Sequence, residues 1–307
     1  MKKGSIIGLF FIFLFFTSYS QNDSLLSPAR DTIPKDSVSV IQHNEHEVKS
    51  ISNKKESIYK LKRGVDIPII AVGTSWSLYA FTKIYKKPAP DTTVIQGLNS
   101  NNVNALDRLA MYPYSKSLNN FSYYPFYASI PLPLIFFLSD KEMRSDFFKL
   151  SFLYWEAMSI TGLLGTSATF HIDRYRPYGY FHDSHGTMEN DASIGVVKNS
   201  FYAGHVQVVA TPTFFLAKVY ADYHPDSKIK WVFYGIASAA TVSMGYMRIK
   251  AGEHFLSDVF LGAATGALAG ILVPQYHKTK STKAPDIGIL PYSTGDIQGL
   301  ILTYKLK

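Results

Sequence analysis

The chain has 307 residues, with 31 lysines and arginines against 23 aspartates and glutamates, and no cysteine. The lack of cysteine excludes disulfides, cysteine-ligated zinc, iron–sulfur clusters and thiolate nucleophiles. Only 18% of the residues are charged and 15% are aromatic, against roughly 25% charge in globular chains, so the composition favours a membrane-associated protein. The basic residues are scattered and form no known nucleic-acid motif, so we expect no nucleic-acid partner.

The first 20 residues have the pattern of a secretory signal peptide. Lys2 and Lys3 precede the apolar stretch 6–16, and serines follow it before a possible cleavage point. An uncleaved anchor is the alternative, but this stretch makes only about 16 Å of helix, too short for a hydrocarbon core of ~30 Å. We therefore expect a cleaved signal over 1–20. Residues 21–63 are polar and lack apolar periodicity, which is typical of a solvated linker.

From residue 64 onward, the chain alternates between apolar stretches and short polar segments. The nearly charge-free stretches are 67–82, 117–139, 150–170, 199–217, 231–247 and 259–276. Their lengths suit short or tilted membrane helices, and the small residues in 262–270 allow close helix packing. We predict an all-α fold, a six-helix membrane bundle over 64–277. A soluble helical bundle is the alternative, because the mean hydropathy is only +0.01.

The tail, 278–307, has a different pattern. Its apolar segments 287–291 and 299–304 flank a Ser-Thr-Gly-Asp turn, which predicts a β-hairpin. No function is assigned to it.

Three polar segments at the ends of the apolar stretches carry the candidate chemistry. In the first, Arg174 and Arg176 precede Pro177; they form either a stop signal for insertion or a fork that matches phosphate. The second, Gly204-His205, opens an apolar stretch. There the N–H groups and dipole of a helix N-terminus face an anion, and His205 is placed to donate a proton to a leaving group. A purely structural histidine is the alternative.

The third segment contains Arg248, His254 and Asp258. Residues four apart share one helix face, so the Asp258 carboxylate is expected to accept one imidazole N–H of His254 and leave the other nitrogen free to act. Arg248 adds a cation for an anionic substrate. An interfacial His–Asp pair that only caps the helix is the alternative.

Together the three segments resemble the type 2 phosphatidic acid phosphatase (PAP2) superfamily, which also includes bacterial acid phosphatases and vanadium haloperoxidases. The superfamily pattern is K-x6-RP, then PSGH, then SR-x5-H-x3-D, and the resemblance covers about 65–277. The matching residues are Arg176, Pro177, Gly204, His205, Arg248, His254 and Asp258.

The chain also departs from that pattern. Thr169 replaces the lysine, Tyr202 and Ala203 replace Pro-Ser, and Met247 replaces the serine. In the superfamily, the lysine and serine that are missing here normally contact phosphate. The resemblance therefore implies either weakened activity or other side chains that donate hydrogen bonds to phosphate in their place. Arg174 and Lys250 are the candidate substitutes.

The resemblance implies two-step phosphoryl transfer without a metal or other cofactor. His254 attacks phosphorus to form a phosphohistidine, Asp258 orients it, and His205 protonates the leaving oxygen and then activates water. The groups expected to hold the phosphate oxygens are Arg176, Arg248, the Gly204 N–H and Arg174.

The resemblance further implies a phosphatase in the bacterial cell envelope that acts on a lipid phosphate or pyrophosphate. A soluble periplasmic acid phosphatase and a degenerate, non-catalytic lipid-phosphate binder are the alternatives; a haloperoxidase fits less well, because the same losses weaken a vanadate site. Lys228, Lys230 and Lys278 lie at the helix ends opposite His205 and His254, so the positive-inside rule places the active site on the periplasmic side. Counting six spans after a cleaved signal gives the opposite side.

Two further groups of polar residues stand outside the motifs. Glu156 lies within an apolar stretch, so it is expected to be paired or to line a polar cavity. The other group is either a metal site or, as we expect, a solvated loop. Its members are His182, Asp183, His185, Glu189 and Asp191.

Overall fold

The computed structural model describes residues 57–181, 195–279, 287–294 and 297–304. The expected signal peptide, most of the linker and the loop with His182 and His185 lie outside the described residues. For the strands, only the backbone is described.

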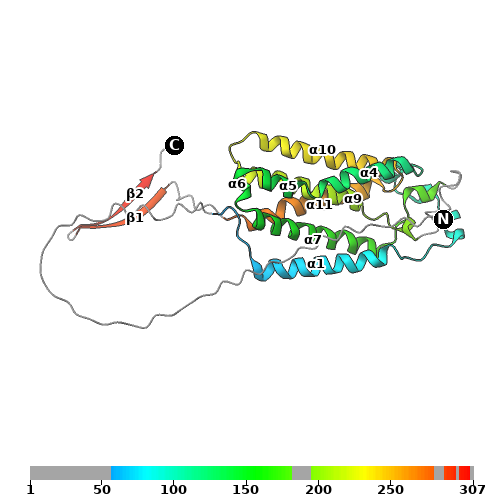
Figure 1. The fold of residues 1–307 in the computed structure, drawn as a ribbon, viewed down its shortest axis with the longest axis horizontal. Coiled ribbons are helices and arrows are strands. Elements are labelled where there is room, and N and C mark those ends of the chain that lie inside the picture. The colour runs from blue at the N-terminus through cyan, green and yellow to red at the C-terminus, as the bar shows by residue number, and fades with distance from the viewer. Residues whose placement is uncertain (1–56, 182–194, 280–286, 295–296, 305–307) are drawn as a thin grey trace. The chain divides into compact units, whose positions relative to one another are not determined.

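Within the described residues, six long helical segments run side by side in one bundle (Figure 1), and this confirms the predicted all-α fold. Each coincides with one of the predicted apolar stretches, although the second is broken into two helices. The segments are α1 (Arg63–Ile84), α4 (Lys116–Ser129) with α5 (Leu132–Ser139), α7 (Phe147–His171), α9 (Gly204–Tyr223), α10 (Ile229–Lys250) and α11 (Leu256–His277).

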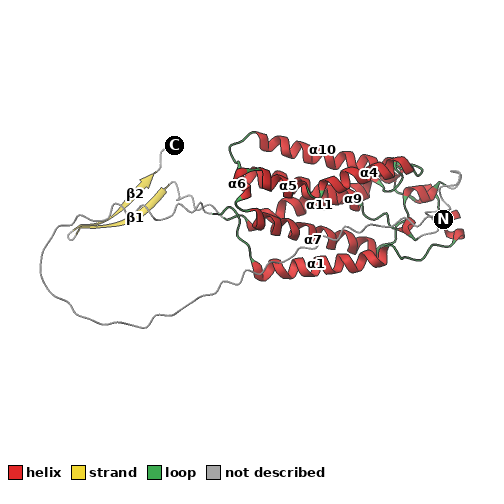
Figure 2. Ribbon diagram, viewed as in Figure 1, coloured by secondary structure: helices red, strands yellow, loops and turns green. Residues whose placement is uncertain are grey.

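Short helices connect the long ones, and two strands follow the bundle (Figure 2). The short α-helices are α2 (Thr92–Gln96), α3 (Ala105–Arg108) and α6 (Lys141–Arg144). The break between α4 and α5 falls at Pro131 and Pro133, because proline lacks the N–H that a continuous helix needs. Strands β1 (Ile287–Thr294) and β2 (Ile297–Tyr304) pair antiparallel within the segment where a hairpin was expected.

Helix α9 forms the centre of the bundle, packed by α11, α10 and α7, and by α4 and α5. Its closest neighbour is α11, whose glycines Gly262, Gly266 and Gly270 face it. A Cβ atom at these positions would lie only 2.6, 2.4 and 2.6 Å from carbonyl oxygens of α9 or of the residue before it. Any side chain there would push the helices apart, so these three glycines allow the close packing that positions both ends of α11.

Large apolar side chains are exposed on the outer surface of the bundle, whereas several charged groups are enclosed. Phe121 on α4, Trp231 on α10 and Phe260 on α11 are 59–69% exposed, while Asp66 and Arg248 are almost fully buried. By length and composition, α1, the α4–α5 segment and α11 can cross a membrane. This arrangement is that of an integral membrane protein, with lipid outside and polar groups inside.

The prediction of six membrane helices thus holds for the number of long helical segments, but only three of them are apolar enough to span on their own composition. The other three, α7, α9 and α10, carry buried polar residues such as Glu156, Gln207 and Arg248 on their inner faces. These residues lower the mean hydropathy of a helix without facing lipid.

Candidate active site

A cavity of about 140 Å³ lies at the end of the bundle where α1 and α7 finish and α9 begins. We call it the active-site cavity. It brings together residues from all three motif segments. Those that carry the argument are Thr169, Arg176, Gly204, His205 and His254.

His254 lies in the turn between α10 and α11 and is 3% exposed. Its Nδ1 lies 2.7 Å from the main-chain carbonyl oxygen of Ser200. Because a carbonyl can only accept, Nδ1 donates, and in the neutral ring Nε2 keeps its lone pair. Burial, followed by the nearby Arg176 and Arg248 guanidinium groups, holds the pKa of His254 well below its usual value. The ring is therefore a neutral nucleophile candidate.

Asp258 does not contact His254 in the way the sequence predicted. Helix α11 begins at Leu256, so His254 precedes the helix and the two residues are not one helical turn apart. Asp258 instead accepts hydrogen bonds from the Ser200 hydroxyl (2.6 Å) and the Phe255 N–H (3.0 Å). The carboxylate thus fixes Ser200, and the Ser200 carbonyl in turn orients His254.

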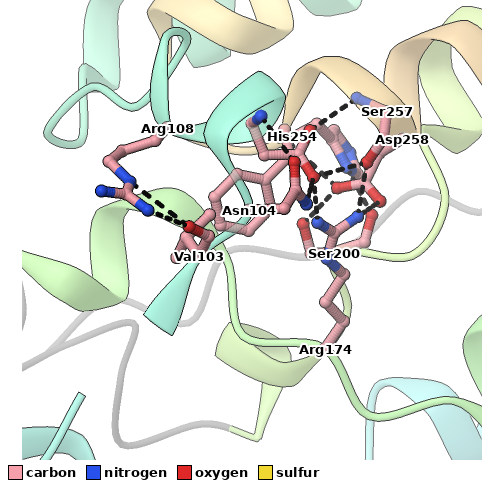
Figure 3. A network of polar contacts seen from close by, with 10 residues as sticks. Val103, Asn104, Arg108, Arg174, Ser200, His254, Ser257 and Asp258 are labelled. Atoms are coloured by element: carbon pink, nitrogen blue, oxygen red, sulfur yellow. Dashed lines mark hydrogen bonds and ion pairs between the residues drawn. The ribbon is translucent and has the colours of Figure 1, made fainter. Parts of the chain in front are cut away.

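Arg174 belongs to this supporting network (Figure 3). It is not among the residues that line the cavity. Its guanidinium pairs with Asp258 and, at 2.6 Å, with Asp107, and lies 4.4 Å from the centre of the Phe255 ring. The expected contact between Arg174 and substrate is therefore not supported by the geometry. The segment is held by backbone bonds, including one from the Ser200 N–H to the Arg174 carbonyl (3.0 Å).

Asp107, on the short helix α3, was not predicted from the sequence. It is fully buried and accepts the main-chain N–H and the hydroxyl of Ser257, both at 2.8 Å. Burial alone would raise its pKa, but the hydrogen bonds from Ser257, Asn104 and Arg174 lower it. An ionised Asp107 fixes the first turn of α11 and Arg174 together. Near Asp107, the sequence offered only one indication of structure, the N-cap residue Asn104 before a four-residue helix.

The two motif arginines meet a second carboxylate that the sequence did not single out. Arg176 lines the cavity and pairs with Glu253, and the Nη2 atom of Arg248 lies 3.1 Å from the same Glu253 oxygen. Arg248 is 1% exposed and also donates to Asn119 (2.7 Å) and Ser122 (2.9 Å) of α4. One glutamate, adjacent to His254, thus balances both cations expected to bind phosphate.

Gly204 and His205 are the first two residues of α9, and no side chain caps this helix. The free N-terminus directs its dipole toward the cavity. The His205 ring packs between Tyr123 and Phe126 of α4, with centroids 4.9 and 4.6 Å apart. Its Nε2 has no hydrogen-bond partner among the described residues. That nitrogen is available for proton transfer.

The departures from the motif also have defined surroundings. Thr169 lines the cavity and donates to the Gly165 carbonyl of its own helix. Lys87, from the segment after α1, donates to the Thr169 carbonyl at 2.6 Å and pairs with Asp173. The candidate substitute Lys250 lies 3.8 Å from the centre of the Tyr112 ring, away from the cavity. Lys87 thus contacts the main chain at Thr169, but it is not among the residues that line the cavity.

Comparison with known proteins bears on the same segments. Residues 150–282 match the PAP2 superfamily. The match confirms the resemblance seen in the motifs, spans α7 to α11 with every motif residue, and supports phosphatase activity in general. The chain is also similar to a transmembrane PAP2-type phosphatidylglycerolphosphate phosphatase from Bacillus subtilis, with 19% identity and a TM-score of 0.41, over 70% of this chain and 98% of that one. No curated protein matches the chain.

Proposed function

We propose that this protein hydrolyses a lipid phosphate or pyrophosphate through a phosphohistidine on His254. The observation that carries the proposal is that His254, His205 and Arg176 line one cavity. A nucleophile, a proton donor and a cation that matches phosphate are the three parts that phosphoryl transfer requires.

In the first step, Nε2 of His254 attacks phosphorus and the bond to the leaving oxygen breaks. His205 gives its proton to that oxygen, and the resulting neutral His205 then takes a proton from water. The water oxygen attacks the phosphohistidine, which releases inorganic phosphate and restores His254. Arg176 and the N-terminus of α9 stabilise the charge on the equatorial oxygens, and Arg248, which shares Glu253 with Arg176, adds its positive charge from outside the cavity lining.

The lining of the active-site cavity favours a lipid substrate over a soluble one. Beside the polar groups, the cavity is lined by Phe81 and Ile84 of α1, Phe126 of α4 and Val208 of α9. A headgroup can thus bind the arginines while its apolar chain contacts these side chains. A non-catalytic lipid-phosphate binder is the second candidate, since Thr169 and Ala203 replace groups that the PAP2 pattern aims at phosphate.

The test is phosphate release by the purified protein in mixed micelles. Phosphatidate, phosphatidylglycerophosphate and undecaprenyl pyrophosphate should be hydrolysed faster than glycerol phosphate, with vanadate inhibiting competitively because it adopts the geometry of the transition state. Activity in the presence of a chelator, with folding followed in parallel, tests the expected lack of a catalytic metal. Binding of lipid phosphate without release, and without a trapped acid-labile phosphoenzyme, would show a binder instead.

We further propose that the active site faces the periplasm, on the basis of the lysines at the opposite helix ends. The lack of cysteine makes this testable with single-cysteine variants. Asn101→Cys lies near α3 and Asp226→Cys between α9 and α10, both exposed. An impermeant maleimide added to intact cells with a permeable outer membrane should label the first variant only. Labelling of the second alone would reverse the orientation.

A further inference from the structure

The end of the bundle opposite the active-site cavity contains a second buried cluster of ionisable groups. Asp66 of α1, Glu156 of α7 and His277 of α11 are at most 2% exposed. One ligand atom from each lies within 4.8 Å of the other two. His277 is 19 residues beyond Asp258 on the same helix, or about 29 Å at 1.5 Å per residue. This cluster is separate from the proposed catalytic residues.

The tautomer of His277 is set by its own helix. Its Nδ1 lies 2.9 Å from the Val273 carbonyl, which can only accept, so Nδ1 carries a hydrogen. In a neutral ring, Nε2 then has a lone pair, yet it faces an oxygen of Asp66 at 3.0 Å and one of Glu156 at 3.6 Å. Three electron pairs point at one another, and this arrangement requires a positive species between them.

Glu156 supplies an independent indication of a ligand at this cluster. Its Oε2 has no hydrogen-bond donor among the described residues, although its side chain is only 3% exposed. An adjoining cavity of about 250 Å³ is otherwise lined by apolar and aromatic side chains, including Ile69, Ile160 and Leu272. A buried carboxylate oxygen without a hydrogen-bond donor in such surroundings is costly.

Charge and geometry agree on what would occupy this position. A proton on His277 leaves the two carboxylates with one positive charge, whereas a divalent ion balances both. Tetrahedral zinc with bonds of about 2.05 Å separates its ligand atoms by about 3.3 Å, between the observed 3.0 and 3.6 Å. The ring N–H bound to a carbonyl is also the usual outer contact of a metal-bound histidine, and Asp66 is held similarly by the Lys62 N–H at 2.6 Å.

We propose that Asp66, Glu156 and His277 form a binding site for a divalent first-row transition metal, with zinc as the representative ion, that joins α1, α7 and α11. Water would complete the four ligands. The imidazole ligand favours this class over magnesium or calcium, which take oxygen ligands. The site acts on stability and is independent of the proposed function, because none of its residues lines the active-site cavity.

The experiment uses the full chain, purified in detergent without a histidine tag, stripped with a chelator and dialysed against Zn²⁺. We expect one zinc per chain by mass spectrometry, with a Kd of roughly micromolar or tighter. The thermal midpoint should rise by about 3 °C or more in saturating Zn²⁺, and Mg²⁺ should give no such rise.

Three variants test the ligands: Asp66→Asn, Glu156→Gln and His277→Gln should each weaken zinc binding at least tenfold. The matched control is His224→Gln, because His224 pairs with a single carboxylate, Asp140, at the same 3.0 Å; this variant should bind zinc like the wild type. Wild-type protein that takes up no stoichiometric zinc overturns the proposal, and this measurement needs no variant to fold. Zinc retained by all three variants also overturns it.

Discussion

His254 and His277 lie at opposite ends of the bundle and share one local geometry. In each, Nδ1 donates to a main-chain carbonyl, Ser200 at 2.7 Å and Val273 at 2.9 Å, and both rings are almost fully buried. Their neighbours differ in charge. Arg176 and Arg248 act electrostatically on His254, whereas Asp66 and Glu156 adjoin His277.

In both histidines a main-chain carbonyl fixes the tautomer, and we infer that the neighbouring charges select the chemistry. Among guanidinium groups, a free Nε2 lone pair is kept unprotonated and an anion is attracted, which suits attack on phosphorus. Among carboxylates, the same lone pair attracts a cation. The fold alone therefore does not assign a role to a buried histidine. The sign of the charge on the neighbouring side chains does.

The largest expected effect comes from replacing His254, the histidine of this pair that is proposed to be catalytic. His254→Asn should lower turnover by at least about 10³-fold, because it removes the proposed nucleophile while keeping a polar side chain. Phosphate release and phosphoenzyme trapping are the measurements. His224→Asn is the control and should retain activity. If His254→Asn kept a tenth of wild-type turnover, His254 would not be the nucleophile.

The next effect concerns how His254 is held. Asp258→Asn weakens the contacts to Ser200 and Arg174, and a displaced nucleophile is expected to cost about 100-fold in kcat with little change in KM. Ser200→Ala leaves the Ser200 carbonyl in place and should cost less. Thermal unfolding is followed in parallel, since Asp258 also bonds the first turn of α11. A rise in KM without a fall in kcat would contradict a positioning role.

The depressed pKa of His254 predicts the acid limb of the pH profile. Only the neutral ring attacks, so kcat/KM falls as the pH drops through the pKa of His254. Because burial and the arginines hold that pKa below 6.5, the fall should begin below pH 6.5 and then approach tenfold per pH unit. The substrate phosphate also ionises in this pH range, so its pKa is measured by phosphorus NMR and its contribution to the pH profile is subtracted. A limb above pH 7 would exclude this environment for His254.

The smallest effect sharpens the charge argument. Glu253→Gln removes the negative charge shared by Arg176 and Arg248, so inorganic phosphate and vanadate should inhibit about fivefold to tenfold more strongly, equivalent to about 1 kcal/mol or slightly more. Glu142→Gln, on α6, is the control. Weaker inhibition in Glu253→Gln would mean that Glu253 aligns the arginines more than it competes with phosphate.

The sequence was sufficient to predict the helices, because each is a long apolar stretch bounded by polar residues. It was also sufficient to bring His205, His254 and Arg176 to one site, since a known motif pattern includes all three. The prediction that Asp258 bonds directly to His254 was wrong. The two residues share a helix face only if α11 begins before His254, and it begins at Leu256.

Other parts of the site had no local signature. Asp107 reaches Ser257 across 150 residues, and Glu156 and His277 come together only when α7 and α11 pack. Glu253 stood within the third motif at a position that the pattern leaves variable. Its role depends on where two distant arginines point, which spacing along the chain does not determine.

The three glycines of α11 have a mechanical consequence. Carbonyl oxygens at the start of α9 and along it occupy the space where side chains would stand on Gly262, Gly266 and Gly270, so α11 cannot slide by a fraction of a turn or roll about its axis without collision. Between Gly262 and Gly270, α11 and α9 therefore keep one register, and a shift of either helix along this contact would displace the other.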